Sequence, residues 1–409
     1  MTTDLREVAE ADVYVGDELV AHLVRERGDR VSFDYIGEPP QADTRIRGRS
    51  VSWSLLRSGL YPVVTTSGAV PAFFAGLLPE GVRLGVVTSS MKTSADDHFT
   101  LLLAIGADTI GDVRVVPTGV DPARPQPMFE PERDTDFQGV YARLTGSVDA
   151  DPVGLSGVQA KVSAATLSVP TRTRSGPAIL KLSPVQYPML VENEHFFMTM
   201  AAACGLRVAT TSLIHDVEDR SALLVTRFDR EGSARIAQED ACQVADMYPA
   251  AKYRITTETA ITALADACAR GGGSKVAAVL ELLKTVAFSW LIGNGDLHGK
   301  NLSIHNANGV WQPTPGYDLL CTQPYARWRD PMALNLYGRA KRLTRPDFVD
   351  AGERLGVRPR ATARMIDEIV DAAQEWPNRC GDIGFDDRQT GLLARLLQER
   401  IASLQETGV

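Results

Sequence analysis

The 409-residue sequence lacks several features that assign other chains to a class. No apolar run is long enough to span a bilayer, and the N-terminal stretch MTTDLREVAEAD is charged and has no apolar signal core. We therefore expect a cytoplasmic protein without a membrane partner. The five cysteines form no C-x-x-C pair, which argues against zinc ligation and favours buried thiols over disulfides.

An excess of positive charge is also missing. The formal net charge is -8, and charged residues make up 23% of the chain. A protein that binds nucleic acid by itself needs a dense Lys/Arg face, so this composition argues against direct binding. The apolar fraction of 44% is sufficient for a large core and for two or three domains. We find no internal repeat and no long low-complexity tract.

The first part of the chain is predicted to be a small mixed domain. A hairpin is expected around the turn Gly16-Asp17, and period-two alternation predicts strands at 31–36 and 51–55. Helices should follow, the first beginning after Pro71 and the second capped by Ser94 and ending before Gly106. The Pro- and Asp-rich stretch 117–152 predicts a domain boundary.

Beyond that boundary, the pattern changes from strands to helices. Strands are predicted at 178–182 and 222–225, with a helix at 194–204 between them. After Arg230 the chain is mostly helical, with a buried helix at 276–292 and a last helix at 386–405. We expect four segments, which are residues 1–120 as an N-terminal subdomain, 121–152 as a linker, 153–230 as a strand-rich lobe and 231–409 as a helical lobe.

The segment Gly295-Asp296-Leu297-His298-Gly299-Lys300-Asn301 has the D-x-x-x-x-N spacing of a kinase catalytic loop. Phosphoryl transfer needs a carboxylate for the proton of the attacking hydroxyl and hard oxygen ligands for Mg²⁺, which Asp296 and Asn301 can supply. Asp318, in the apolar stretch 315–320, stands where kinases keep a metal-binding carboxylate. Each aspartate alone is more often a turn residue, but this order favours a kinase.

Two upstream segments fit the same chemistry. Lys181 lies inside a predicted apolar strand, where an unpaired charge is costly, so ATP phosphates and Glu194 are candidate partners. The alternative is an edge-strand lysine that points to solvent. The loop Ser156-Gly157-Val158-Gln159-Ala160-Lys161 opens the strand-rich lobe, and glycines there let backbone N–H groups approach phosphates. Taken alone, that loop would be an ordinary turn.

Together these motifs resemble the HipA family of serine/threonine kinases. They are S-G-V-Q-x-K at 156–161, I-L-K at 179–181, N-E at 193–194, R-F-D-R at 227–230, G-D-x-H-x-K-N at 295–301 and Y-D at 317–318. The similarity extends to Phe73-Phe74, 77–81 and 103–106, and covers nearly the whole chain. It implies an α+β, two-lobed, protein-kinase-like fold, with a strand-rich N-lobe, a helical C-lobe and an additional N-terminal α/β subdomain.

The resemblance also implies roles for individual residues. Asp296 would be the catalytic proton acceptor, Asn301 and Asp318 would hold Mg²⁺, and Lys181, held by Glu194, would contact the ATP phosphates. The backbone of the hinge 226–228 would contact adenine. The other residues implied in ATP binding are Ser156, Gly157, Val158, Gln159, Ala160, Lys161, Thr226, Arg227, Phe228, His298, Gly299, Lys300 and Tyr317.

Family members are toxins of toxin–antitoxin systems. The resemblance therefore implies a protein acceptor in the translation machinery, such as an aminoacyl-tRNA synthetase. It also implies a HipB-like helix-turn-helix antitoxin as a partner. The kinase would then bind operator DNA only through this antitoxin.

Two other functions remain open. The string G-D-L-H-x-x-N also resembles small-molecule phosphotransferases of the aminoglycoside and choline type, although the N-terminal domain and the loop 156–161 speak against them. The second alternative is that the chain is catalytically inactive and serves only as a corepressor together with a DNA-binding antitoxin. The intact residues Asp296, Asn301, Asp318 and Lys181 argue against it.

Self-modification is expected to fall on Ser156 if it occurs. Many relatives phosphorylate a serine two positions earlier, where this chain has Gly154. Incubation with Mg-ATP should then place a phosphate on Ser156 in the wild type but not in Asp296→Asn, as seen by peptide mass spectrometry. ATP binding should weaken, because the added negative charge opposes return of the loop to a phosphate pocket. An unmodified loop after long incubation would instead indicate that Ser156 only donates a hydrogen bond to a nucleotide phosphate.

Overall fold

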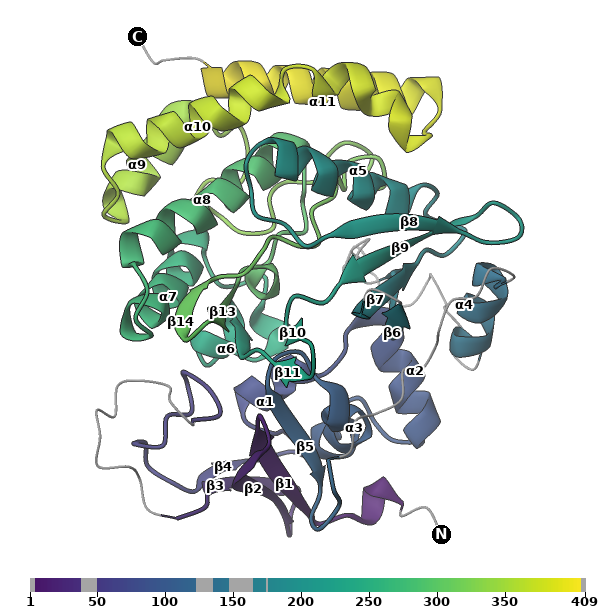
Figure 1. The fold of residues 1–409 in the computed structure, drawn as a ribbon, viewed down its shortest axis with the longest axis vertical. Coiled ribbons are helices and arrows are strands. Elements are labelled where there is room, and N and C mark those ends of the chain that lie inside the picture. Colours follow the sequence, from purple (N-terminus) through teal and green to yellow (C-terminus); the bar gives the residue numbers. More distant parts are fainter. Residues whose placement is uncertain (1–3, 38–49, 123–134, 147–164, 174–175, 406–409) are drawn as a thin grey trace.

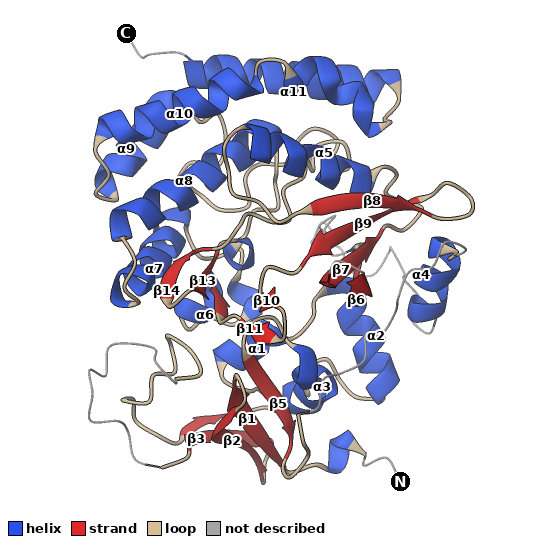
Figure 2. Ribbon diagram, in the orientation of Figure 1, coloured by secondary structure: helices blue, strands red, loops and turns tan. Residues whose placement is uncertain are grey.

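The computed structural model describes residues 4–37, 50–122, 135–146, 165–173 and 176–405. Three parts follow one another along the molecule in Figure 1, with the N-terminal domain at one end, a four-stranded lobe in the middle and a helical lobe at the other end. Figure 2 shows that helices dominate the end formed by the C-terminal third of the chain. This arrangement confirms the expected α+β class with an additional N-terminal domain.

The N-terminal domain is built on an antiparallel sheet of order β4-β3-β2-β1-β5. Its strands are β1 (Glu10–Val15), β2 (Glu18–Glu26), β3 (Arg30–Tyr35), β4 (Val63–Thr65) and β5 (Val113–Pro117), and its helices are α1 (Ala72–Leu77), α2 (Gly81–Met91) and α3 (His98–Ile105). The predicted hairpin is confirmed, with Gly16 at φ +59° in the turn. Phe33, Phe73, Phe74 and Phe99 fill the core between sheet and helices.

The N-lobe is an antiparallel sheet of order β6-β7-β9-β8, and helix α5 packs on it. Its elements are β6 (Leu167–Thr173), β7 (Gly176–Leu182), α5 (Leu190–Ala203), β8 (Thr211–His215) and β9 (Ser221–Thr226). The segment expected to be a linker contains a helix that was not predicted, α4 (Phe137–Thr145). Phe137 and Val140 of this helix join the apolar cluster of β6 and β7, so α4 is packed against the lobe.

The C-lobe is a helical bundle around α8, the buried helix predicted at 276–292. Its helices are α6 (Ala241–Val244), α7 (Thr257–Arg270), α8 (Lys275–Ile292), α9 (Arg345–Arg354), α10 (Pro359–Ala373) and α11 (Asp387–Gln405), and its strands are β10 (Arg230–Glu231), β11 (Ala234–Arg235), β12 (Gln238–Asp240), β13 (Ser303–Ala307) and β14 (Val310–Pro313). Ser274 caps α8 by accepting from the Ala277 N–H, and Gly293 ends it in the left-handed region.

Two local predictions were wrong because hydrogen bonds and ion pairs that the sequence does not reveal determine the backbone conformation at these positions. Residues 51–55 form no strand, since the Ser52 hydroxyl and the Trp53 N–H donate to the buried carboxylate of Glu239. Helix α3 begins after Asp97 rather than Ser94. The Asp97 carboxylate accepts from the Thr100 N–H and also binds Arg25, so it outcompetes the serine as the cap.

A buried charge cluster joins the N-terminal domain to the segment that leaves β9. Asp229, 3% exposed, pairs with Arg227 at 2.8 Å and with Arg230 at 2.6 Å, and accepts the Gly111 N–H at 2.9 Å. Both arginines also bind Asp108 of the N-terminal domain. Burial raises the pKa of Asp229, but the bonds and charges of Arg227 and Arg230 lower it more, so the carboxylate stays ionised at neutral pH.

Replacing Asp229 by alanine should destabilise the protein strongly. Two buried guanidinium groups would lose their shared acid, a change that typically costs about 3–5 kcal/mol. Urea denaturation at pH 7 measures the effect, and Asp266→Ala, which removes a half-exposed pair with Lys275, should change stability by less than about 0.5 kcal/mol. Equal unfolding midpoints for the two variants would contradict the prediction.

Candidate functional site

A cavity of about 300 Å³ lies where all three parts of the molecule meet. Strands β6, β7 and β9 border it from the N-lobe, and the segments around α1, α2 and α3 border it from the N-terminal domain. Figure 1 shows α2 directly below β6. The residues that line it are Gly76, Leu77, Leu78, Pro79, Arg83, Ile105, Asp108, Thr109, Ile110, Ser168, Pro170, Ile179, Lys181, Val225, Thr226, Arg227, Phe228, Asp229, Gln238, Asp240, Gln243, Lys300, Ser303, Tyr317 and Asp318. The cavity therefore contains many of the residues selected from the sequence.

Lys181 connects the two lobes inside this cavity. Its ammonium on β7 donates to Glu194 of α5 at 2.6 Å and to the Asp318 carboxylate in the C-lobe. Burial alone lowers the pKa of Lys181, but the charges of Asp318 and Glu194 raise it more, so the net pKa lies above its ordinary value. The lysine is thus a permanent cation, and the predicted pairing with Glu194 is present.

The catalytic-loop sequence forms a tight turn directly after α8. The Asn294 side chain accepts from the Asp296 N–H at 2.9 Å and donates to the Asp318 carbonyl at 3.3 Å. A Cβ at Gly295 would lie 2.0 Å from an oxygen of Asp330, so a larger residue there would displace the Asp330 carboxylate. These contacts hold Asp296, which is 4% exposed, in one position relative to Asp318.

Tyr253 is the partner of Asp296 that the sequence did not indicate. Its hydroxyl donates to the Asp296 carboxylate at 2.8 Å, and its ring packs edge-on against His298. Burial raises the pKa of Tyr253, and the Asp296 charge raises it further, so the phenol stays protonated. No motif marks this tyrosine, because it comes from the segment before α7, far from the loop in sequence.

Asn301 lies beside Asp318, as the metal hypothesis requires. Its amide nitrogen donates to Asp318 Oδ2 at 3.1 Å, and its amide oxygen accepts from the His298 N–H at 3.1 Å. Among the residues that the structure describes, no group of three or more His, Cys, Asp or Glu side chains could hold a metal ion. One carboxylate and one amide fit Mg²⁺ that completes its shell with phosphate oxygens and water.

Lys300 is held on both sides within the protein. Its ammonium donates to Asp240 at 3.0 Å and to the Gly76 carbonyl at 2.6 Å, which ties the loop to the N-terminal domain. Its own carbonyl accepts from the Tyr317 hydroxyl at 2.7 Å. Gly299 is buried under Cys242, where a Cβ would come within 2.7 Å of the thiol sulfur. The loop is therefore rigid along its whole length.

The predicted hinge lines the cavity, but two of its backbone donors are already occupied. The N–H groups of Thr226 and Arg227 donate to the carbonyls of Thr210 and Pro177. The Arg227 side chain points into the charge cluster with Asp108. Phe228 presents its ring beside that of Tyr317, with the centroids 5.9 Å apart. An adenine contact at this hinge would therefore use backbone groups other than these two N–H donors, or the aromatic surface of Phe228.

The loop 156–161 lies outside the described residues, so the structure places none of Ser156, Gly157, Val158, Gln159, Ala160 and Lys161. The other candidate residues fall into two sets. Lys181, Thr226, Arg227, Phe228, Lys300, Tyr317 and Asp318 line the cavity. Asp296, His298, Gly299, Asn301 and Glu194 do not line it. Glu194 and Asn301 bond directly to the lining residues Lys181 and Asp318, His298 bonds to Asn301, and Asp296 is connected to Asp318 through Asn294.

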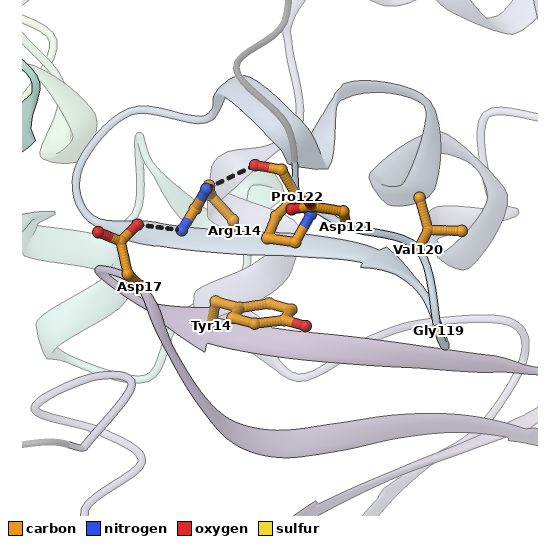
Figure 3. Close-up of a pocket in the computed structure, with 7 residues that line it drawn as sticks. All are labelled: Tyr14, Asp17, Arg114, Gly119, Val120, Asp121 and Pro122. Carbon is orange, nitrogen blue, oxygen red and sulfur yellow. Dashed lines mark hydrogen bonds and ion pairs between the residues drawn. The ribbon is translucent and has the colours of Figure 1, made fainter.

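A second hollow lies on the N-terminal domain, away from this site (Figure 3). Arg114 extends across it over the Tyr14 ring, and its guanidinium is bound to Asp17 at 2.7 Å and to the Pro122 carbonyl at 2.7 Å. Because the arginine is already paired, this hollow offers no comparable set of reactive groups. In the described part of the chain, no helix is long and apolar enough to cross a membrane.

Two family models match the chain. The HipA-like C-terminal domain matches residues 153–376, and the HipA N-terminal domain matches residues 11–116. Two proteins of Sinorhizobium fredii that are named as candidate kinases, Y4mE and Y4dM, are 30% and 33% identical to the chain. The alignments cover 74% and 67% of this chain, and 77% and 67% of those relatives.

A relative from Shewanella oneidensis, the serine/threonine-protein kinase toxin HipA, is 27% identical over 79% of this chain and 77% of its own length. The fold also matches a solved structure of the HipA, HipB and operator DNA complex from that organism. The TM-score is 0.72, with 22% identity and 96% of each chain covered. The two family-model matches, the similar relatives and the shared fold lead to one assignment: the chain belongs to the HipA family and is a HipA-like kinase.

Proposed function

We propose that the chain is a serine/threonine protein kinase that transfers the γ-phosphoryl group of Mg-ATP to a protein serine. The observation that carries the proposal is the cross-lobe contact of Lys181 with Glu194 and Asp318, beside a rigid loop that holds Asp296 and Asn301. Protein kinases use a strand lysine, a helix glutamate, a catalytic aspartate and two metal ligands in this combination. The cavity beside these groups is the proposed ATP site.

In the proposed reaction, the Asp296 carboxylate accepts the proton of the attacking serine hydroxyl. The serine oxygen forms a bond to the γ-phosphorus while the bond from that phosphorus to the bridging oxygen breaks, and ADP leaves with the electron pair. Bound Mg²⁺ would neutralise phosphate charge, with Asp318 and Asn301 as its protein ligands. Lys181 stays protonated and orients the phosphates, and Tyr253 keeps the Asp296 carboxylate in place by its hydrogen bond.

We further propose a role as a toxin that is neutralised by a HipB-like helix-turn-helix antitoxin in the cytoplasm. Two facts support it, namely that the Shewanella oneidensis relative is named a kinase toxin and that the matching structure is a toxin–antitoxin complex with operator DNA. The acceptor would be a component of translation of the aminoacyl-tRNA synthetase class. The proposed domain division is an N-terminal subdomain at 1–120, a linker at 121–152, the N-lobe at 153–230 and the C-lobe at 231–409. ATP would bind between the N-lobe and the C-lobe.

Replacing Asp296 by asparagine should abolish phosphoryl transfer and leave ATP affinity within about threefold, because the carboxylate acts on the acceptor proton. Wild type and variant are incubated with γ-labelled ATP, magnesium and cell lysate, and ATP affinity is measured by calorimetry. Label on a protein band only with the wild type supports the proposal. Label on a small molecule supports an aminoglycoside- or choline-kinase type of activity, and no label at all supports an inactive corepressor.

Replacing Asp318 by alanine should remove the magnesium dependence of ATP binding. Asp318 is the charged member of the proposed metal pair, and it also contacts Lys181. Calorimetric titrations with ATP in magnesium and in EDTA should therefore differ for the wild type but coincide for Asp318→Ala. Asp382→Ala, which changes an exposed acid paired with Arg379, is the matched control and should behave as wild type. Retained magnesium dependence in Asp318→Ala would refute the metal assignment.

A further inference from the structure

Arg83 is a cavity-lining cation that the proposed mechanism does not use. It lies in the first turn of α2, in the N-terminal domain, and its side chain is only partly exposed. No described residue forms a hydrogen bond or an ion pair with its guanidinium. Burial lowers the pKa of Arg83, and nearby Arg227 lowers it further, whereas Asp108 opposes both. The negative charge of Asp108 therefore does not offset the effects of burial and of Arg227 on Arg83.

The other cations that line the cavity are matched by acids of the chain. Lys181 is bound by Glu194 and Asp318, and Lys300 is bound by Asp240. Arg227 is bound by Asp108 and Asp229. Asp108 is the acid that raises the pKa of Arg83, but its carboxylate already forms ion pairs with Arg227, Arg230 and Arg235. Within the described lining, Arg83 is thus the cation without an acidic partner.

Helix α2 is well placed to present this charge to a ligand. Glu80, at its N-terminus, pairs with Lys252 of the C-lobe, while Val82 packs on the apolar cluster of the N-lobe sheet. The first turn of α2 therefore contacts both lobes, and α2 lies below β6 in Figure 1. Both ends of this turn are anchored, so Arg83 is held at the cavity wall.

We propose that Arg83 binds the phosphate chain of the nucleotide, which makes the N-terminal domain a third wall of the ATP site. This inference rests on the proposed ATP-dependent function. The ligand group must be anionic, because a partly buried guanidinium without a counter-charge is unfavourable, and adenine and ribose are neutral. Arginine is suited to the role, since its planar fork binds phosphate oxygens through two parallel hydrogen bonds.

The test compares ligands with and without phosphates on the full chain. Wild type, Arg83→Gln and Arg83→Lys are titrated by calorimetry with ATP, ADP and adenosine in magnesium buffer. Loss of one charge-assisted contact should raise the Kd of Arg83→Gln for ATP and ADP by roughly tenfold or more and leave adenosine within about twofold. Arg83→Lys should lie between the two, because it keeps the charge but loses the fork.

The matched control is Arg27→Gln, which changes an exposed arginine in the turn between β2 and β3 and should bind every ligand as wild type does. An unchanged ATP affinity in Arg83→Gln overturns the inference. So does an equal loss for adenosine, which would indicate contact with the nucleoside or a disturbed fold. A wild type that binds no ATP would refute the proposed function itself, whereas failure of Arg83→Gln to lose affinity refutes only the role of Arg83.

Discussion

The buried ammonium of Lys181 is the charge on which the arrangement of the two lobes depends. It lies on a strand of the N-lobe sheet, and its two acids come from α5 and from the segment after β14. Burial raises the pKa of Glu194, and Lys181 opposes that rise, so the pair is favourable only while the contact is intact. Shifting one lobe relative to the other would break the contact between Lys181 and Asp318, whereas Glu194 would stay with Lys181 because both lie in the N-lobe. The same contact places Asp318 next to Asn301 and so defines one end of the cavity.

The N-terminal domain is integrated into this framework through charges and not merely attached beside it. Asp108 reaches the arginines at the end of β9, and the Gly76 carbonyl accepts from Lys300 of the catalytic loop. Glu239 of the C-lobe in turn binds Ser52 and Trp53. Each of these contacts joins segments more than a hundred residues apart. The N-terminal domain is therefore bonded directly to the segment that leaves β9, to Lys300 and to β12.

The sequence predicted the parts of the site whose chemistry is local. A lysine in an apolar strand, a glutamate in the next helix and the D-x-x-x-x-N loop after a buried helix are patterns within a few residues, and the structure has these elements where they were expected. Tyr253, Asn294 and Asp240 were missed because their roles depend on the fold, which brings separate segments together. The strand wrongly predicted at 51–55 failed for the same reason, since Glu239 of a distant strand takes its backbone donor.

The cations that line the cavity are of two kinds, those bound by acids of the chain and Arg83, which no acid in the described part of the chain binds. The sequence alone did not distinguish them. The family resemblance implied Lys300 in ATP binding, yet its ammonium is bound by Asp240 and the Gly76 carbonyl. Burial lowers the pKa of Lys300, but Asp240 and Glu80 raise it more, so it is a stable cation that holds the loop to the N-terminal domain. A ligand would have to replace those bonds to recruit it. An arginine without such bonds, as at position 83, gains from the ligand without losing a contact, so the N-terminal domain is the source of charge for the nucleotide that requires the least rearrangement.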